Sequence, residues 1–193
     1  MRRSAAILCG GRALRFGGRD KAALVVDGRT ILERQLAELR RVEALDDIMV
    51  VGGSAAVSGT RLVADTVPGS GPLGGIHAAL VHASNDAVYV CACDMPNITA
   101  PFVARLFEEL GDADIAVPET NRGYHPLCAV YTRACLDAVA RRLADRRLKV
   151  KELFADVRTR VVNLLNAAPG DILPLVNVNT PEEFAALPGH DQP

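Results

Sequence analysis

One short segment near the N-terminus combines glycines with cations. It follows the apolar run Ala5–Leu8, starts at Gly10 and ends at Lys21. Glycine lets the backbone approach a ligand closely and point several N–H groups at one anion. Arginine and lysine side chains neutralise phosphate charge. The segment therefore predicts a phosphate-binding loop. A surface loop with solvated charges is the weaker alternative, because the segment follows a buried strand and is long, cationic and glycine-rich together.

Two well-known phosphate loops do not match this segment. The P-loop needs Gly, Lys and Ser or Thr in direct succession. Here Lys21 follows Asp20 and precedes Ala22. The dinucleotide-binding spacing Gly-x-Gly-x-x-Gly does not occur in the segment either. We therefore expect a phosphate loop of another kind.

A carboxylate ends the apolar run Val88–Cys93. This residue is Asp94, and Pro96 then turns the chain. Mg²⁺ is usually held by one or two carboxylates, with waters and substrate phosphates completing its shell, so Asp94 is a candidate magnesium ligand. The structural alternative is a helix cap. Cys91 and Cys93 are too few for a four-ligand zinc site, and alternate positions on a strand share a face, so we expect both in the core.

Other polar residues follow predicted strands or precede predicted helices. Asp65 ends a strand and precedes a glycine-rich stretch over residues 68–75, which would bring a helix N-terminus close to an anion. A tight strand-to-helix connection is the alternative. Structural roles are equally open for His125 and for the pair Arg146 and Arg147. Further candidates are Asn177 and Asn179, since asparagine offers both a donor and an acceptor.

The elements that must position these residues alternate along the chain. The candidate strands are Ala5–Leu8, Ile48–Val51, Arg61–Ala64, Val88–Cys91, Ile115–Val117, Cys128–Tyr131 and Val161–Leu164. The candidate helices lie near 30–42, 73–83, 101–110, 133–144, 149–156 and 181–187. Such alternation predicts an α/β fold with three layers and a mostly parallel, doubly wound sheet. Ligands bind such sheets at the carboxyl ends of the strands.

Two helix starts carry capping signals. Thr30 and Glu33 form a capping box, and Thr180 precedes Pro181 and Glu183 in a similar arrangement. No internal repeat or linker interrupts the chain. We expect a single domain over residues 1–187 and a frayed tail over 188–193.

The bulk composition limits the partners. The chain has 193 residues, of which 49% are apolar, so one domain can bury a substantial core. A net charge of −1 argues against a general nucleic-acid binder. No apolar run approaches the ~18 residues that span a bilayer, so we expect no membrane partner. The five cysteines are scattered and odd in number, which favours a reducing cytoplasm over a disulfide framework.

Taken together, these motifs resemble the molybdenum cofactor guanylyltransferases, a family within the wider nucleotidyltransferase group. The resemblance starts with Leu8-Cys9-Gly10-Gly11 and with Arg15-Phe16-Gly17-Gly18-Arg19-Asp20-Lys21. The segments that continue it are Asp65 with Gly71-Pro72-Leu73, Cys93-Asp94-Met95-Pro96, His125-Pro126, Arg146-Arg147 and Asn177-Val178-Asn179-Thr180-Pro181-Glu182-Glu183. They occur in order and cover nearly the whole chain.

The resemblance implies a reaction, a metal and partners. GMP would pass from GTP to molybdopterin or its molybdenum-loaded form, with release of pyrophosphate. The sheet would be Rossmann-like, as in nucleotide-diphospho-sugar transferases. Asp94 would bind Mg²⁺, and Lys21 and Arg15 would offset charge on the leaving pyrophosphate. Transient contact with proteins that supply the cofactor, or receive it, is also implied.

The resemblance also assigns binding residues. The nucleotide would contact Leu8, Cys9, Gly10, Gly11, Gly18, Lys21, Asp65 and Asp94. The pterin would contact His125, Arg146, Arg147, Asn177 and Asn179.

Gly10 and four departures from the family pattern bear on the nucleotide site. Relatives that transfer cytidylate to the same pterin carry Ala where this chain has Gly10, so Gly10 favours guanylate. Cys9 replaces the usual Ala and weakens that inference. Phe16 replaces a usual Met, which we interpret as a packing change. Gly52 and Gly53 stand where many members have Asn, so one side-chain contact to the nucleotide is in doubt.

Three alternatives stay open. The first is a cytidylyltransferase acting on the same pterin. The second is a sugar-phosphate nucleotidyltransferase, which would usually have Pro-Lys at the end of the loop, in place of Asp20-Lys21, and a longer sugar-binding half. The third is a non-catalytic nucleotide-binding regulatory module, and the presence of both Asp94 and Lys21 argues against it.

Overall fold

The computed structural model of the chain describes residues 2–9, 21–53 and 57–185. Most of the glycine-rich segment therefore lies outside the described residues. The predictions for Gly10, Gly11, Arg15, Phe16 and Gly18 fall there. The predicted frayed tail, residues 188–193, also lies outside them.

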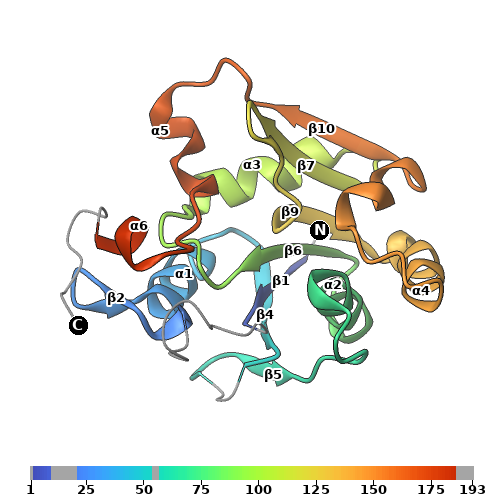
Figure 1. Cartoon of the computed structure of the whole chain (residues 1–193), viewed down its shortest axis with the longest axis horizontal. Coiled ribbons are helices and arrows are strands. Elements are labelled where there is room, and N and C mark those ends of the chain that lie inside the picture. The colour runs from blue at the N-terminus through green and yellow to red at the C-terminus, as the bar shows by residue number, and fades with distance from the viewer. Residues whose placement is uncertain (1, 10–20, 54–56, 186–193) are drawn as a thin grey trace.

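One mixed sheet forms the middle layer of the described residues (Figure 1). Its strands are β1 (Arg3–Leu8), β4 (Leu45–Val51), β5 (Arg61–Val63), β6 (Ala87–Ala92), β7 (Ile115–Thr120), β9 (Cys128–Thr132) and β10 (Thr159–Asn163), and β8 (Gly123–Tyr124) pairs with β7. The strand order is β10-β7-β9-β6-β1-β4-β5. β9 runs antiparallel to β6 and β7, β8 is antiparallel to β7, and the other pairs are parallel. The predicted mostly parallel sheet is confirmed.

Helices cover both faces of this sheet. α1 (Ile31–Leu39) and α3 (Ala100–Leu110) pack on one face, where Ala5 and Ile7 point. α2 (Gly71–His82) and α4 (Leu136–Ala144) pack on the other, where Ala6 and Leu8 point. Successive strand residues point to opposite faces. A sheet buried on both faces therefore needs the continuous apolar runs seen in the sequence.

Several short elements differ from the predictions. Residues 149–156 form a 3₁₀ helix, η4 (Val150–Ala155), rather than an α-helix. The hairpin of β2 (Val25–Val26) and β3 (Arg29–Thr30) was not predicted. The sequence pair Asp27-Gly28 could have predicted this hairpin. Both residues adopt positive φ, as a two-residue hairpin turn requires. The remaining short helices are η2 (Lys21–Ala23), η3 (Arg133–Cys135), α5 (Pro169–Ile172), η5 (Leu173–Leu175) and α6 (Pro181–Ala185).

Local capping follows the predictions. The Thr30 hydroxyl accepts a hydrogen bond from the Glu33 N–H at 3.1 Å, and the Glu33 carboxylate accepts one from the Thr30 N–H at 2.8 Å. At the start of α6, Thr180 Oγ1 accepts from the Glu183 N–H at 3.2 Å. All five cysteines are free thiols, as the sequence predicted. Within the described ranges, the helices are too short or too polar to cross a membrane.

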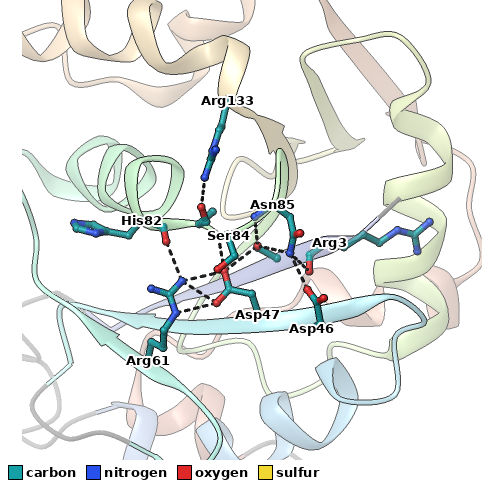
Figure 2. A network of polar contacts seen from close by, with 10 residues as sticks. Arg3, Asp46, Asp47, Arg61, His82, Ser84, Asn85 and Arg133 are labelled. Atoms are coloured by element: carbon teal, nitrogen blue, oxygen red, sulfur yellow. Dashed lines mark hydrogen bonds and ion pairs between the residues drawn. The ribbon is translucent and has the colours of Figure 1, made fainter.

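A polar network closes the amino-terminal edge of the sheet (Figure 2). The buried Asp47 carboxylate accepts hydrogen bonds from Ser4 Oγ at 2.9 Å and from the Ser84 N–H at 2.8 Å. Arg61 binds both Asp47 oxygens and also donates to the His82 carbonyl at 2.8 Å. These contacts tie β1, β4 and β5 to the end of α2. These contacts lie at the amino-terminal ends of the strands, and the candidate site lies at the carboxyl ends.

Candidate functional site

The carboxyl ends of β1, β4 and β6 meet at one point of the sheet (Figure 1). Leu8, the last residue of β1, pairs with Val51 on one side and Ala92 on the other. The Cys9 N–H donates to the Val51 carbonyl at 2.8 Å, and the Cys93 N–H donates to the Leu8 carbonyl at 3.1 Å. The glycine-rich segment thus leaves the sheet between two strand ends, where ligands of α/β sheets bind.

Asp94 lies in the turn that follows β6. Its Oδ1 atom is buried. Its carbonyl accepts a hydrogen bond from the Val178 N–H at 2.8 Å. Asn177 and Asn179 flank Val178, so this bond brings both asparagines beside the turn that carries Asp94. The structure therefore joins two predicted site segments that are distant in sequence.

Lys21 is linked to the same turn through a small apolar cluster. Lys21 opens η2, and Leu24 follows that helix closely. Leu24 packs with Ile31, Val178 and the β2 residue Val26. Val178 therefore contacts the apolar residues that follow Lys21 and also hydrogen-bonds the backbone of Asp94.

Gln35 is a residue that the sequence analysis missed. Its side chain is completely buried on α1, and Nε2 donates to the carbonyls of Ala92 at 2.8 Å and Met95 at 3.0 Å. These carbonyls lie on either side of Asp94. The signal in the sequence was a polar residue four positions after Ile31, on the face of α1 that packs on the sheet.

Asp65 lies between β5 and α2 and is half-buried. Its Oδ1 accepts a hydrogen bond from the Val67 N–H at 3.0 Å. A Cβ atom at Gly74 would come within 3.0 Å of that same oxygen, and one at Gly75 within 3.0 Å of the Leu8 side chain. Both glycines therefore let the start of α2 pack closely against Asp65 and the end of β1. The contacts are compatible with a tight connection and with a nucleotide contact.

The spacing Gly-x-Gly-x-x-Gly does occur once in the chain, at Gly69, Gly71 and Gly74. Gly69 and Gly71 both adopt positive φ, which side chains rarely do. Here the glycines follow the short strand β5 and open α2, so they shape the connection around Asp65.

His125 lies shortly before β9, the strand that pairs with β6. Its Nε2 is 2.8 Å from the Thr120 hydroxyl. The Leu127 carbonyl, two residues on, accepts from the Ala92 N–H at 3.1 Å. Burial, and then the positive charge of Arg122, lower the pKa of His125 below its usual value. The side chain is therefore neutral at pH 7 and hydrogen-bonded.

The predicted arginine pair follows α4. Arg146 and Arg147 are exposed, and Arg147 Nη2 lies 3.8 Å from Glu152 Oε2 on η4. The same carboxylate pairs with the buried Arg142 at 3.1 Å. The ring of Phe154, also on η4, packs edge-on against Tyr124 at 5.3 Å between centroids. η4 thus brings the arginine pair to the residue that precedes His125.

The contacts therefore form two adjoining groups. The first contains Leu8, Cys9, Asp94, Asn177 and Asn179 around the ends of β1 and β6. The second contains His125 and Arg147 around β8 and η4. A hydrogen bond from the Ala92 N–H to the Leu127 carbonyl, 3.1 Å long, connects the two groups.

Comparisons with known proteins show the family to which the chain is similar. A family model described as the MobA-like NTP transferase domain matches residues 5–185. The chain is 34% identical to the molybdenum cofactor guanylyltransferase of Desulfosudis oleivorans, over 92% of this chain and 90% of that protein. It is 36% identical to the probable molybdenum cofactor guanylyltransferase of Pelotomaculum thermopropionicum, over 92% and 88% respectively.

Solved structures share the fold. Molybdopterin-guanine dinucleotide biosynthesis protein A from Archaeoglobus fulgidus superposes with a TM-score of 0.73 at 23% identity, covering 93% of this chain and 94% of that one. The Rv0371C complex with manganese from Mycobacterium tuberculosis gives 0.69 at 17% identity, covering 95% and 96%. At these identities the likeness concerns the Rossmann-like fold.

Proposed function

The chain belongs to the family of MobA-like NTP transferase domains, and we propose that it transfers GMP from GTP to molybdopterin. The products are the guanine dinucleotide cofactor and pyrophosphate. One structural observation supports this most strongly: the end of β1 at Leu8 and Cys9, the turn that carries Asp94 and the Asn177–Asn179 segment meet at one end of the sheet. These are the motif segments that the reaction needs together.

The proposed reaction is a single displacement at phosphorus. An oxygen of the pterin's terminal phosphate forms a bond to the α-phosphorus of GTP. The bond between that phosphorus and the oxygen bridging to the β-phosphate breaks, and pyrophosphate leaves. Such transfers depend mainly on positioning and on offsetting charge, so no covalent enzyme intermediate is required.

We assign Asp94 as a ligand of Mg²⁺. Magnesium prefers oxygen ligands and often takes one carboxylate, with phosphates and waters completing its shell. Asp94 fits that requirement, because it lies in the turn after the buried strand β6, and the preceding residue, Cys93, hydrogen-bonds the Leu8 carbonyl at the end of β1. When bound, the ion would offset charge on the triphosphate.

The remaining nucleotide contacts are assigned from the motif. Lys21 and Arg15 would neutralise charge on the leaving pyrophosphate, and the backbone of Gly10, Gly11 and Gly18 would approach the phosphates. Asp65 would contact the nucleotide from the start of α2. Leu8 and Cys9 would line its site at the end of β1. Gly10 supports GTP over CTP as the donor.

The acceptor would be bound by residues of both groups. Asn177 and Asn179 would hydrogen-bond the pterin edge, which presents donors and acceptors. His125 would act as a neutral hydrogen-bonding group, because burial lowers its pKa. Arg146 and Arg147 would pair with the acceptor's phosphate. We further propose cytoplasmic action and transient contact with the proteins that supply molybdopterin or receive the product.

A pyrophosphate-release assay tests the proposed function. The purified chain is incubated with Mg²⁺, molybdopterin and either GTP or CTP, and the dinucleotide is identified by mass spectrometry. We expect pyrophosphate and the guanine dinucleotide with GTP, and slower release with CTP. Faster turnover with CTP would support the cytidylate alternative. Turnover with a sugar phosphate in place of molybdopterin would support the sugar-phosphate alternative, and absence of product with every pair would refute catalysis.

A further inference from the structure

Gln35 holds the turn that carries Asp94 on both sides. Its side chain is 0% exposed, in a helix face whose other buried members are Ile31, Leu36 and Leu39. Nε2 donates one hydrogen bond to the carbonyl of Ala92, the last residue of β6, and another to that of Met95. The amide thus bridges the ends of the four-residue segment that contains Asp94.

The burial of this amide needs an explanation beyond packing. An apolar side chain would fill the same place in the core without the desolvation cost of a polar group. The amide nitrogen uses both of its hydrogens on the two carbonyls, but the amide oxygen Oε1 is buried and has no hydrogen-bond partner among the described residues, so that cost is offset only in part. A side chain with a single donor could hold only one end of the segment. The two carbonyls therefore require a side chain that presents two donor hydrogens beside Asp94.

Helix α1 also contacts residues that follow this segment. Arg34 Nε lies 3.4 Å from the Pro96 carbonyl, and Glu38 Oε2 accepts from the Ala100 N–H at 2.8 Å. On its other side, the Asp94 carbonyl accepts the bond from Val178. The turn is therefore held between α1 and the Asn177–Asn179 segment. Among these contacts, those of Gln35 lie on both sides of Asp94.

We propose that Gln35 is a positioning residue that sets the backbone of the Asp94 turn for cation binding. Its α1 begins at the capping box on Thr30, after the hairpin that follows Lys21. The inference rests on the proposed role of Asp94 as a metal ligand.

Two variants and a matched control test the inference. Gln35→Met keeps the length and apolar bulk but removes both donors. Gln35→Glu keeps the size and turns an oxygen toward the two carbonyls. Glu38→Ala is the control, because it removes a hydrogen bond from α1 to Ala100, the first residue of α3, away from Asp94. Near-ultraviolet circular dichroism verifies that each variant keeps its tertiary packing.

The primary readout is direct Mn²⁺ binding, measured by electron paramagnetic resonance with an unreactive α,β-methylene GTP analogue. We expect both Gln35 variants to weaken Mn²⁺ binding by about tenfold. This factor corresponds to the net free energy of roughly one hydrogen bond. The Mg²⁺ concentration for half-maximal turnover should rise in parallel. Glu38→Ala should lose thermal stability while keeping wild-type Mn²⁺ affinity.

The outcomes separate this inference from the assignment on which it rests. Wild-type Mn²⁺ affinity in Gln35→Met and Gln35→Glu, with weak binding in Asp94→Ala, would overturn the role of Gln35 and leave Asp94 as a ligand. Wild-type affinity in Asp94→Ala would overturn the metal assignment itself. If Gln35→Met does not fold, the isosteric Gln35→Glu supplies the decisive comparison.

Discussion

Asp94 and Lys21 are the two side chains on which the proposed chemistry depends most. We predict that Asp94→Ala and Lys21→Ala each lower kcat by about 10²–10³-fold, the usual cost of removing one group that stabilises transition-state charge. Both variants should stay folded, because neither change removes apolar core. Steady-state pyrophosphate release measures the effect.

Matched controls exist for both substitutions. Asp86 is exposed at the opposite end of β6, and Lys151 is an exposed lysine on η4. Asp86→Ala and Lys151→Ala should therefore keep wild-type turnover. Turnover near that of wild type in either site variant would refute the assignment of that residue.

The five thiols should differ sharply in reactivity. Cys91, Cys128 and Cys135 are buried, and burial raises the pKa of Cys128 and of Cys135 to about 12. Because the thiolate is the reactive form, these three should resist a disulfide reagent in the native protein. Cys9 and Cys93 are half-buried at the strand ends beside the candidate site, so we expect the reaction there.

Peptide mapping after limited labelling at pH 8 checks this prediction. Labels should appear on Cys9 and Cys93, and the other three thiols should react after denaturation. Bound GTP analogue and Mg²⁺ should slow the labelling if the nucleotide covers the strand ends. Early labelling of Cys128 would contradict the burial of that strand.

At the scale of elements, Asp47 joins β1, β4, β5 and the end of α2 (Figure 2). Burial by itself would raise the pKa of Asp47. The hydrogen bonds from the Ser84 N–H, Arg61 and Ser4 outweigh burial and hold the pKa below its usual value of 3.8. A carboxyl whose pKa is lowered on folding adds stability above its unfolded pKa and loses it as the pH falls through the folded pKa.

We therefore predict that Asp47→Asn lowers the free energy of unfolding by about 2 kcal/mol at pH 7. The loss is smaller than for a fully buried ion pair, because the Arg61 side chain is partly exposed. The difference from wild type should shrink as the pH falls below about 4. Urea unfolding at several pH values measures both effects. Turnover per folded molecule should stay unchanged, because the network lies at the edge opposite the site. A difference in stability that does not depend on pH would contradict the pKa argument.

At the scale of the whole molecule, the two apolar layers share one sheet. One layer contains Ala5, Ile7 and Tyr89, and the other contains Ala6, Val88 and Val90, so β1 and β6 contribute to both. Loss of either layer would expose strands needed by the other. We predict one cooperative unfolding transition, in keeping with the expected single domain over residues 1–187.

Scanning calorimetry tests that prediction through the agreement of calorimetric and van 't Hoff enthalpies. Two separate transitions would contradict it. Magnesium and GTP at about a hundred times Kd should stabilise the native state by about 2.7 kcal/mol. The melting temperature should rise accordingly, and less so in Asp94→Ala.

The sequence by itself determined the local elements and the family. Glycine-rich turns, apolar runs of strand length and capping residues act within a few positions, so the main strands, the helix starts at Thr30 and Thr180, and the mostly parallel sheet were predictable. The resemblance to the guanylyltransferases rested on the same short motifs, and the family match confirms it.

Only the tertiary structure decided which distant residues meet. The contact of Val178 with Asp94, the two bonds of Gln35 and the network around Asp47 each join residues far apart in sequence. No local propensity encodes such pairs, because they depend on the strand order and on the antiparallel insertion of β9 between β6 and β7. For the same reason Gln35 looked like an ordinary helix residue until α1 was packed against the end of β6.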